Sequence, residues 1–211
     1  SRNNWIDMVS TQLIVLSKQP YKENALLLGG LSPDYGRVSL VANGAQKLSA
    51  KDFPAADLFR ELEVEFDDSG NSDLHTAKKL ELLFNFDRIA LKPQHFKLAG
   101  RIGGFLLKNA VPGVPQPFTY DALRSILTQL CLDDDVQGRW TMEQCSVVLK
   151  ITYLYENGLL PEAASPEQSD FLEQLVAAGI EDSPLPECRP DYWKTLNGWL
   201  SSLLDYHKLA R

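Results

Sequence analysis

The stretch from Leu13 to Lys47 constrains the fold of this chain more than any other segment. Three short apolar runs lie in or across it, separated by segments that contain glycine or proline: Gln12–Ser17, Ala25–Leu28 and Arg37–Ala42. The third run roughly alternates between polar and apolar side chains, as a half-buried antiparallel strand does. We therefore expect a small meander of three strands near the start of the chain.

The connections between these runs are predicted from residues that restrict the backbone. Pro20 fixes its own φ and disfavours helix at the residue before it, so Lys18–Lys22 is expected to connect the first two strands. Gly29 and Gly30 are expected to weaken or bend the end of the second strand, since glycine inside a strand often marks a bulge. Ser32–Gly36 contains a proline and a glycine, which predicts a tight turn.

Two further strands are expected before residue 85. Leu58–Phe66 alternates cleanly, with three glutamates on one parity, which predicts a strand whose glutamate face is in water. Residues 67–72 have the composition of a hairpin connection, and residues 73–84 are expected to return as the fifth strand. Five short strands within about 80 residues fit a small closed barrel better than a sandwich.

From about residue 85 the apolar period changes from that of strands to that of helices. Five helices are expected, beginning near Pro93, Pro117 or Thr119, Trp140, Pro166 and Pro190. Gly100, Gly103 and Gly104 lie inside the first of them and are expected to mark close packing of another backbone. The predicted class is α+β, with a small antiparallel β-barrel domain over residues 1–84 and an all-helical domain over residues 85–211.

The composition excludes several classes of protein. With 44% hydrophobic and 23% charged residues, the 211-residue chain is expected to form a packed globule. No apolar run approaches the roughly 20 residues that a membrane helix needs, and the first residues lack the pattern of a secretory signal. The three cysteines are widely spaced, which indicates reduced thiols and a cytoplasmic location rather than a disulfide framework.

No motif of a common catalytic or metal site is present. The sequence lacks G-x-S-x-G, a Walker A loop and H-E-x-x-H, so we expect no enzyme activity and no cofactor. The histidines, His75, His95 and His207, fall on separate predicted elements and are expected at the surface or at helix ends. Cys131, Cys145 and Cys188 are too far apart for the paired ligands of structural zinc, so no metal is predicted.

The distribution of charge bears on nucleic-acid binding. The net charge of the chain is −7, which disfavours strong binding to a polyanion. Residues 18–51 nevertheless carry five lysines and arginines against two acids, whereas residues 52–68 carry seven acids against one arginine. A local basic patch can meet phosphate despite an acidic whole, with binding that is weak and sensitive to salt.

Short spaced motifs along the chain suggest a family. They are Trp5, Val15-Leu16, Tyr21-Lys22-Glu23, Gly36-Arg37, Leu40-Val41-Ala42 and Gly44-Ala45. This pattern resembles the RecO family of bacterial recombination mediators and DNA-annealing proteins. The resemblance continues weakly through Phe53-Pro54 to the end of the chain. It implies an N-terminal OB-fold barrel followed by a helical region.

The resemblance also implies a function. It implies a non-enzymatic DNA repair and recombination protein, cytoplasmic and nucleoid-associated, that anneals strands and helps to load a recombinase. Its implied partners are single- and double-stranded DNA, RecR and the C-terminal tail of single-strand-binding protein, with no membrane. Some RecO proteins carry a four-cysteine zinc site after the segment that matches Leu154–Pro161, and this chain has no Cys-x-x-Cys there.

The residues expected to bind DNA lie in the loops of the barrel. They are Lys18, Tyr21, Lys22, Arg37, Lys47 and Lys51, with Tyr35 as a further ring for base stacking. The same lysines could equally be ordinary solvated loop residues. The loop after Gly44-Ala45 is Gln46–Lys51, which is less basic than in typical RecO proteins. The alternative function is therefore a diverged OB-plus-helical interaction module with little affinity for DNA.

Overall fold

The chain folds into two compact units. The computed structural model describes residues 7–44, 55–68 and 70–210. One unit comprises Ser1–Asp87 with Ala110–Gln116, and the other comprises Arg88–Asn109 with Pro117–Arg211. The strands of the first unit are β1 Asp7–Tyr21, β2 Ala25–Ser32, β3 Gly36–Ala42, β4 Arg60–Asp68 and β5 Leu74–Asn85.

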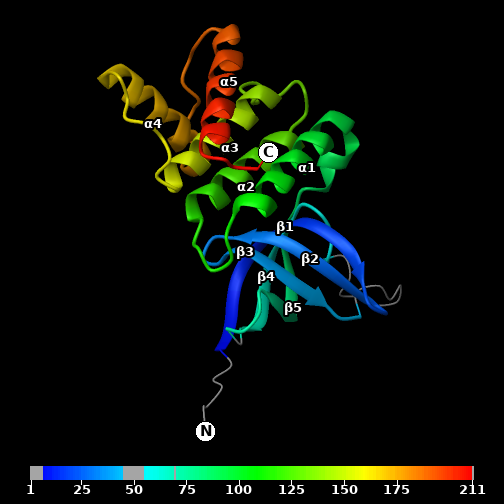
Figure 1. Ribbon diagram of the computed structural model, residues 1–211. Helices are drawn as coiled ribbons and strands as arrows, with labels where there is room; N and C mark the ends of the chain where they lie inside the picture. The colour runs from blue at the N-terminus through cyan, green and yellow to red at the C-terminus, as the bar shows by residue number, and fades with distance from the viewer. Residues whose placement is uncertain (1–6, 45–54, 69, 211) are drawn as a thin grey trace. The chain divides into compact units, whose positions relative to one another are not determined.

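The five strands close into a barrel in the order β1-β2-β3-β5-β4 (Figure 1). Neighbouring strands are antiparallel except β3 and β5, which pair in parallel over three residues. Closure is completed by β1 and β4, which pair from Asp7 to Ile14. This small Greek-key barrel is an OB-fold. The predicted α+β class, with an OB-fold barrel followed by helices, is confirmed.

The barrel interior is filled by side chains from alternate strand positions. Leu13 and Val15 of β1 are fully buried, as are Leu62 and Val64 of β4, and all four belong to one apolar cluster. Burying each such side chain contributes about 1.5–3 kcal/mol relative to leaving it in water. The alternation read from the sequence therefore identifies the inward positions of these strands.

The first hairpin is longer than the sequence predicted. Lys18–Tyr21 does not form a connection but continues β1, and Pro20 pairs opposite Leu26 of β2. Only residues up to Ile14 pair with β4, so Pro20 lies where β1 has its ladder partner on one side only. Proline is tolerated at such edge positions because no ladder bond is lost on the open side.

The paired glycines of β2 do not end the strand. β2 continues through them to Ser32, and the irregularity lies in β1, where Leu16 is the extra residue between the pairs Val15–Gly30 and Ser17–Gly29. A Cβ added at Gly30 would lie 2.4 Å from the carbonyl oxygen of Ile14. Glycine is needed at residue 30 because the bulged strand passes this close.

The tight turn between β2 and β3 holds a strap formed by Ala110–Gln116. The backbone N–H of Gly113 donates to the carbonyl of Tyr35 at 2.8 Å, and that of Gln116 donates to the carbonyl of Pro33 at 2.9 Å. Gly36 has a φ of +64° and forms a bridge to Pro112. The predicted turn is confirmed, and its glycine serves both the backbone conformation and the docking of this strap.

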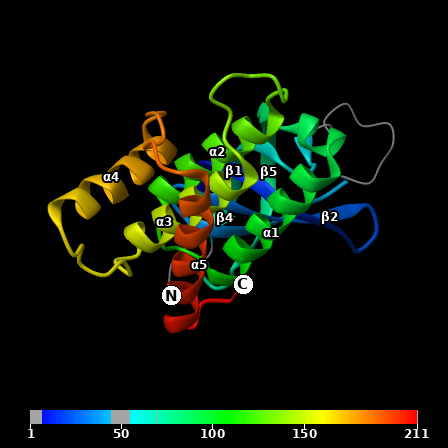
Figure 2. The same cartoon turned by 90° about the horizontal axis from the view of Figure 1, so that it is seen from above.

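The helical unit has five helices, as the sequence predicted. They are α1 Pro93–Asn109, α2 Pro117–Cys131, α3 Met142–Glu156, α4 Pro166–Ile180 and α5 Pro190–Tyr206, preceded by the 3-10 turn η2 Asp87–Leu91. Helix α3 packs against the other four and lies between α1 and α4 (Figure 2). Its run from Cys145 to Leu154 is apolar on nearly every side, as a central buried helix must be.

One expectation about a buried group is wrong, and another is met only in part. Glu61 is buried rather than in water with the other glutamates, because the ladder between β4 and β5 shifts register beside it. His95 lies in the first turn of α1, at a helix end as expected, but it is buried inside the helical unit, where Nδ1 lies 2.9 Å from the carbonyl oxygen of Leu130. That carbonyl lies in the last turn of α2, where a ring N–H can satisfy it.

The expected close packing at the glycines of α1 is also wrong for two of the three. A Cβ added at Gly100 or Gly104 would meet no atom of another element within 4 Å. Because these two glycines have no side chain, the surface of α1 is recessed at their positions. The consequence is a groove along this helix, described below.

Candidate nucleic-acid and peptide interfaces

The β1–β2 hairpin carries three of the predicted site residues near its tip, and two of them are in contact. Lys18 and Tyr21 lie on the last part of β1, and Lys22 begins the turn to β2. The Nζ atom of Lys22 lies 5.3 Å from the centre of the Tyr21 ring, a cation–π contact. Lys22 is exposed and has no ion pair with any described residue. The tip therefore offers a cation and a ring to the same ligand.

Lys18 is partly neutralised within the barrel unit. Its Nζ atom donates to Oδ1 of Asp57 at 2.8 Å, and both side chains remain partly exposed. Burial opposes ionisation of Asp57, but the hydrogen bonds from Lys18 and from the backbone N–H of Leu58 outweigh it, so the pKa of this carboxyl lies below its ordinary value. Lys18 is thus a weaker phosphate ligand than Lys22, because binding must compete with Asp57.

The structure does not place the other predicted residues at this tip. Arg37 pairs opposite Leu31, six residues along β2 from Ala25, which corresponds to about 20 Å. The ring of Tyr35 packs edge-on against Phe66 of the core, so it is less available for stacking than Tyr21. Lys47 and Lys51 lie outside the described residues. The hairpin cluster is therefore Lys18, Tyr21 and Lys22.

A second basic surface lies on α1, which the sequence reading missed. This helix carries Lys97, Arg101 and Lys108 and no aspartate or glutamate. The three cations have a spacing that places them along one side of the helix. The signal was available in the sequence, because α1 is an acid-free helix in a chain of net charge −7.

The basic side of α1 borders a groove of about 780 Å³ between α1, α3 and α5. Its apolar lining comes from Ile102 and Phe105 of α1, Leu149 of α3 and Leu204 of α5. Gly100 and Gly104 also line it, and the missing side chains give the groove its depth. We call this feature the α1 groove.

Polar groups on α3 and α5 hold a fourth cation at the α1 groove. The Nζ atom of Lys150 donates to Oδ1 of Asn197 at 2.6 Å and to Oγ of Ser201 at 3.0 Å. Asn197 and Ser201 are both neutral, and these two hydrogen bonds orient the ammonium group at the groove. The amide of Asn197 in turn donates to Glu143, the one acid that lines the groove. The arrangement suits a ligand that is both acidic and apolar.

The described residues contain no grouping of three or more histidine, cysteine or acidic side chains that could hold a metal ion. Burial raises the pKa of Cys145 to about 12, so this thiol is no nucleophile at neutral pH. None of the helices in the described part of the chain is long and apolar enough to span a bilayer.

Comparison with known proteins finds a family model that matches the barrel. The model of the family described as recombination protein O N terminal matches residues 7–86. DNA repair protein RecO of Polynucleobacter necessarius subsp. necessarius (strain STIR1) is 39% identical over 67 residues. That alignment covers 32% of this chain and 27% of the relative, so it spans about a quarter of the relative's length. The resemblance stated from the sequence motifs is confirmed for this part of the chain.

Proposed function

Residues 7–86 belong to the RecO N-terminal family, and from this premise we propose that the chain is a non-enzymatic DNA-binding protein of recombination and repair. It binds single- and double-stranded DNA, anneals complementary strands, and acts with RecR and single-strand-binding protein to load a recombinase. Its place is the bacterial cytoplasm, at the nucleoid. The observation that carries the DNA-binding part is the hairpin cluster on an OB-fold barrel.

The chemistry of the hairpin cluster fits a single strand. OB-folds bind single strands through cations that contact phosphates and rings on which bases stack. Lys22 supplies a charge that no acid of the described chain neutralises, and Tyr21 supplies the ring beside it. Annealing needs only that two strands lose their mutual repulsion, so no nucleotide hydrolysis is required.

The DNA-binding proposal is tested by the salt dependence of single-strand binding. Lys22→Gln removes one cation without breaking an ion pair. If Lys22 contacts one phosphate, the slope of log K against log salt becomes shallower by about 0.7. Lys194→Gln on α5, an exposed lysine of the helical unit, is the control with the same change in charge and should leave the slope unchanged. Equal slopes for all three proteins would contradict the role of the hairpin.

We assign the α1 groove to the acidic C-terminal tail of single-strand-binding protein. Carboxylates of such a tail would meet Lys97, Arg101 and Lys150, and its apolar side chains would enter between Ile102 and Leu204. The charge of the groove is complementary to an acidic peptide, and its apolar lining distinguishes it from a purely ionic surface. Affinity from the exposed ion pairs alone is small, about 0.2–1 kcal/mol each, so the apolar contacts are needed.

The assignment is tested with a fluorescently labelled tail peptide. Lys97→Gln with Arg101→Gln should weaken its binding about three- to tenfold, and Gly104→Leu should weaken it by filling the groove. The Leu side chain enters open space, so the fold is expected to survive. Lys194→Gln should bind as the wild type does. Unchanged affinity in both groove variants would contradict the assignment.

Two observations favour the alternative of an interaction module with little DNA affinity. Lys18 is tied to Asp57, which leaves the hairpin with one unpaired lysine, and the net charge of the chain is −7. In that case the tail peptide binds, and no single-strand binding is detected even at low salt. The two titrations together therefore separate the two functions.

A further inference from the structure

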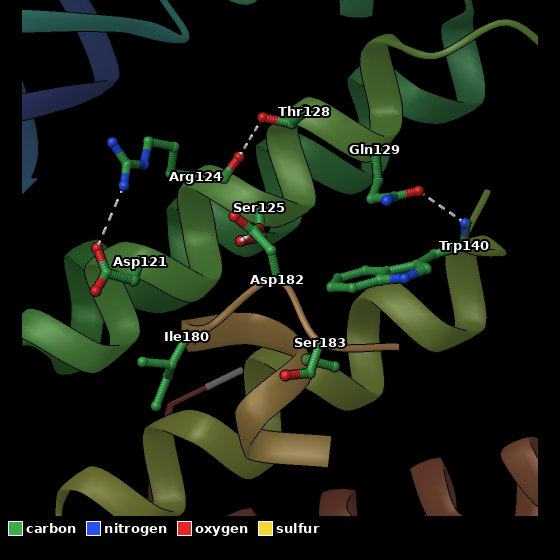
Figure 3. A pocket seen from close by; sticks show the side chains of 10 residues that line it. Asp121, Arg124, Ser125, Thr128, Gln129, Trp140, Ile180, Asp182 and Ser183 are labelled. Carbon is green, nitrogen blue, oxygen red and sulfur yellow. Dashed lines mark hydrogen bonds and ion pairs between the residues drawn. The ribbon is translucent and has the colours of Figure 1, made fainter. Parts of the chain in front are cut away.

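A smaller polar cavity lies on the helical unit, away from the α1 groove. It has a volume of about 280 Å³ and is lined by one side of α2, by the end of α4 and by Trp140 (Figure 3). Its polar lining residues include Asp121, Ser125, Thr128, Gln129, Asp182 and Ser183. Neither the proposed DNA binding nor the proposed tail binding uses any of them.

The side chains that line the cavity carry a net negative charge. Two carboxylates, Asp121 and Asp182, line it from different elements. Burial raises the pKa of Asp121, and although Arg124 lowers it, Asp182 raises it further, so the net shift is upward. Helix α4 also ends at this cavity. The partial negative charge of its last backbone carbonyls adds to the charge of the two aspartates.

Arg124 only partly balances this charge. Its guanidinium lies 3.7 Å from Asp121 in a pair three residues apart on α2, and about half of its side chain is exposed. Figure 3 shows Arg124 directed toward Asp121 and away from Trp140. The hydroxyl of Ser125 donates a long hydrogen bond, of 3.4 Å, to Oδ1 of Asp182. Asp182 has no ion pair with any described residue, so a cation placed between it and Trp140 would meet a carboxylate that Arg124 does not pair with.

Trp140 gives the cavity a flat aromatic wall. Its backbone N–H donates to Oε1 of Gln129 at 2.8 Å, and the preceding Arg139 is paired with Asp134 at 2.9 Å. These contacts hold the segment just before α3 in place. Figure 3 shows the indole lying between α2 and the segment of Asp182 and Ser183. A planar cation can stack on the indole while its N–H groups reach the acids and hydroxyls.

We propose that this cavity binds the guanidinium group of an arginine side chain presented by a protein partner. The volume of about 280 Å³ is at the lower end of that of small-molecule sites, about 300–1,000 Å³, and suits a single planar group. Shape and acceptors decide between the basic side chains. Arginine offers five N–H donors in a plane, which matches an indole wall with carboxylates and hydroxyls at its edge, whereas a lysine ammonium offers a point charge.

The proposal is tested on the full chain by NMR of the Trp140 indole N–H signal, assigned with Trp140→Phe. The probe is Nα-acetyl-arginine amide, and Nα-acetyl-citrulline amide has nearly the same shape without the charge. We expect a saturable shift with the arginine probe and binding at least about tenfold weaker with the citrulline probe. Equal responses to the two probes would overturn the proposal.

Variants of the lining residues test whether the arginine probe binds in this cavity. Asp182→Asn should weaken the arginine probe at least about fivefold, and asparagine tolerates the φ of +54° at this position. Asp170→Asn on α4 does not line the cavity and is the control with the same charge change. No difference between these variants would place binding elsewhere. A protein partner presents its arginine between peptide bonds, as the arginine amide does. Tighter binding of free agmatine than of the arginine amide would therefore contradict the proposal that the ligand is an arginine of a protein.

Discussion

At the scale of the residue, Gly36 shows how one missing side chain fixes a local structure. The motif Gly36-Arg37 was part of the resemblance to RecO, and the structure gives it a physical reason. A Cβ at Gly36 would lie 2.4 Å from the carbonyl oxygen of Val114 and 2.5 Å from that of Val111. Both oxygens are backbone atoms of the strap, so they cannot move aside as a flexible side chain could.

We therefore predict that Gly36→Ala lowers the unfolding free energy by more than the cost of placing an alanine at a positive φ. The matched control is Gly70→Ala, because Gly70 has a similar φ of +68° but open space around the added Cβ. Overpacking costs typically about 1–3 kcal/mol, which is the expected additional loss of unfolding free energy at Gly36. Urea denaturation of both variants measures the loss of unfolding free energy. Equal losses in the two variants would show that the strap Ala110–Gln116 moves to accommodate the added methyl group, and would contradict the prediction.

A second residue-scale prediction concerns Cys145. Burial raises the pKa of its thiol to about 12, so at pH 8 the group is a neutral thiol and reacts poorly. In a chain with Cys131→Ser and Cys188→Ser, Ellman's reagent should find no reactive thiol in the folded protein and one after denaturation. Rapid reaction at pH 8 under native conditions would contradict the buried position of Cys145.

At the scale of the element, glycine has opposite meanings in two helices. A Cβ at Gly104 of α1 meets open space, whereas one at Gly179 of α4 would lie 2.9 Å from Cγ1 of Val148. Gly104→Ala is therefore predicted to raise the unfolding free energy by about 1 kcal/mol through helix propensity. Gly179→Ala should lower it, because α4 packs closely on α3 there. Thermal or urea unfolding that moves both variants in the same direction would contradict this account.

The elements also show how far the sequence predicts the structure. The apolar runs, the alternation in Leu58–Phe66 and the helical periods predicted the presence of all five strands and all five helices, because these patterns follow from burial. Pro20 led to a wrong prediction, because proline ends a strand only where its missing N–H is needed for a ladder hydrogen bond. Whether it is needed depends on where β4 begins, and β4 pairs with β1 only as far as Ile14. Gly100 and Gly104 led to a wrong prediction for a similar reason, because their surroundings are set by other helices.

The candidate sites were less predictable than the fold. The sequence identified Lys18, Tyr21 and Lys22 together, since they are close along one hairpin. It could not show that Asp57 would neutralise Lys18, because that contact joins residues 39 positions apart. The α1 groove depends on three helices and was missed, although the acid-free composition of α1 pointed to one of its walls.

At the scale of the whole molecule, the net charge of −7 conceals a segregation of charge. Helix α4 carries three acids and no base, whereas α1 carries three bases and no acid. Of the two lysines in the hairpin cluster, Lys18 is paired with Asp57 and Lys22 has no ion pair with a described residue, so the number of phosphates contacted there is small. We predict DNA binding that is readily lost on raising the salt concentration, in line with the slope of about 0.7 per contact.

Strand annealing tests the central claim most directly. The wild-type chain at low salt should accelerate pairing of two complementary labelled oligonucleotides, measured by energy transfer between the labels, without any nucleotide cofactor. Lys22→Gln should lower this rate and Lys194→Gln should not. An annealing rate equal to that of the free oligonucleotides, at protein concentrations that saturate the tail peptide, would contradict the proposed function.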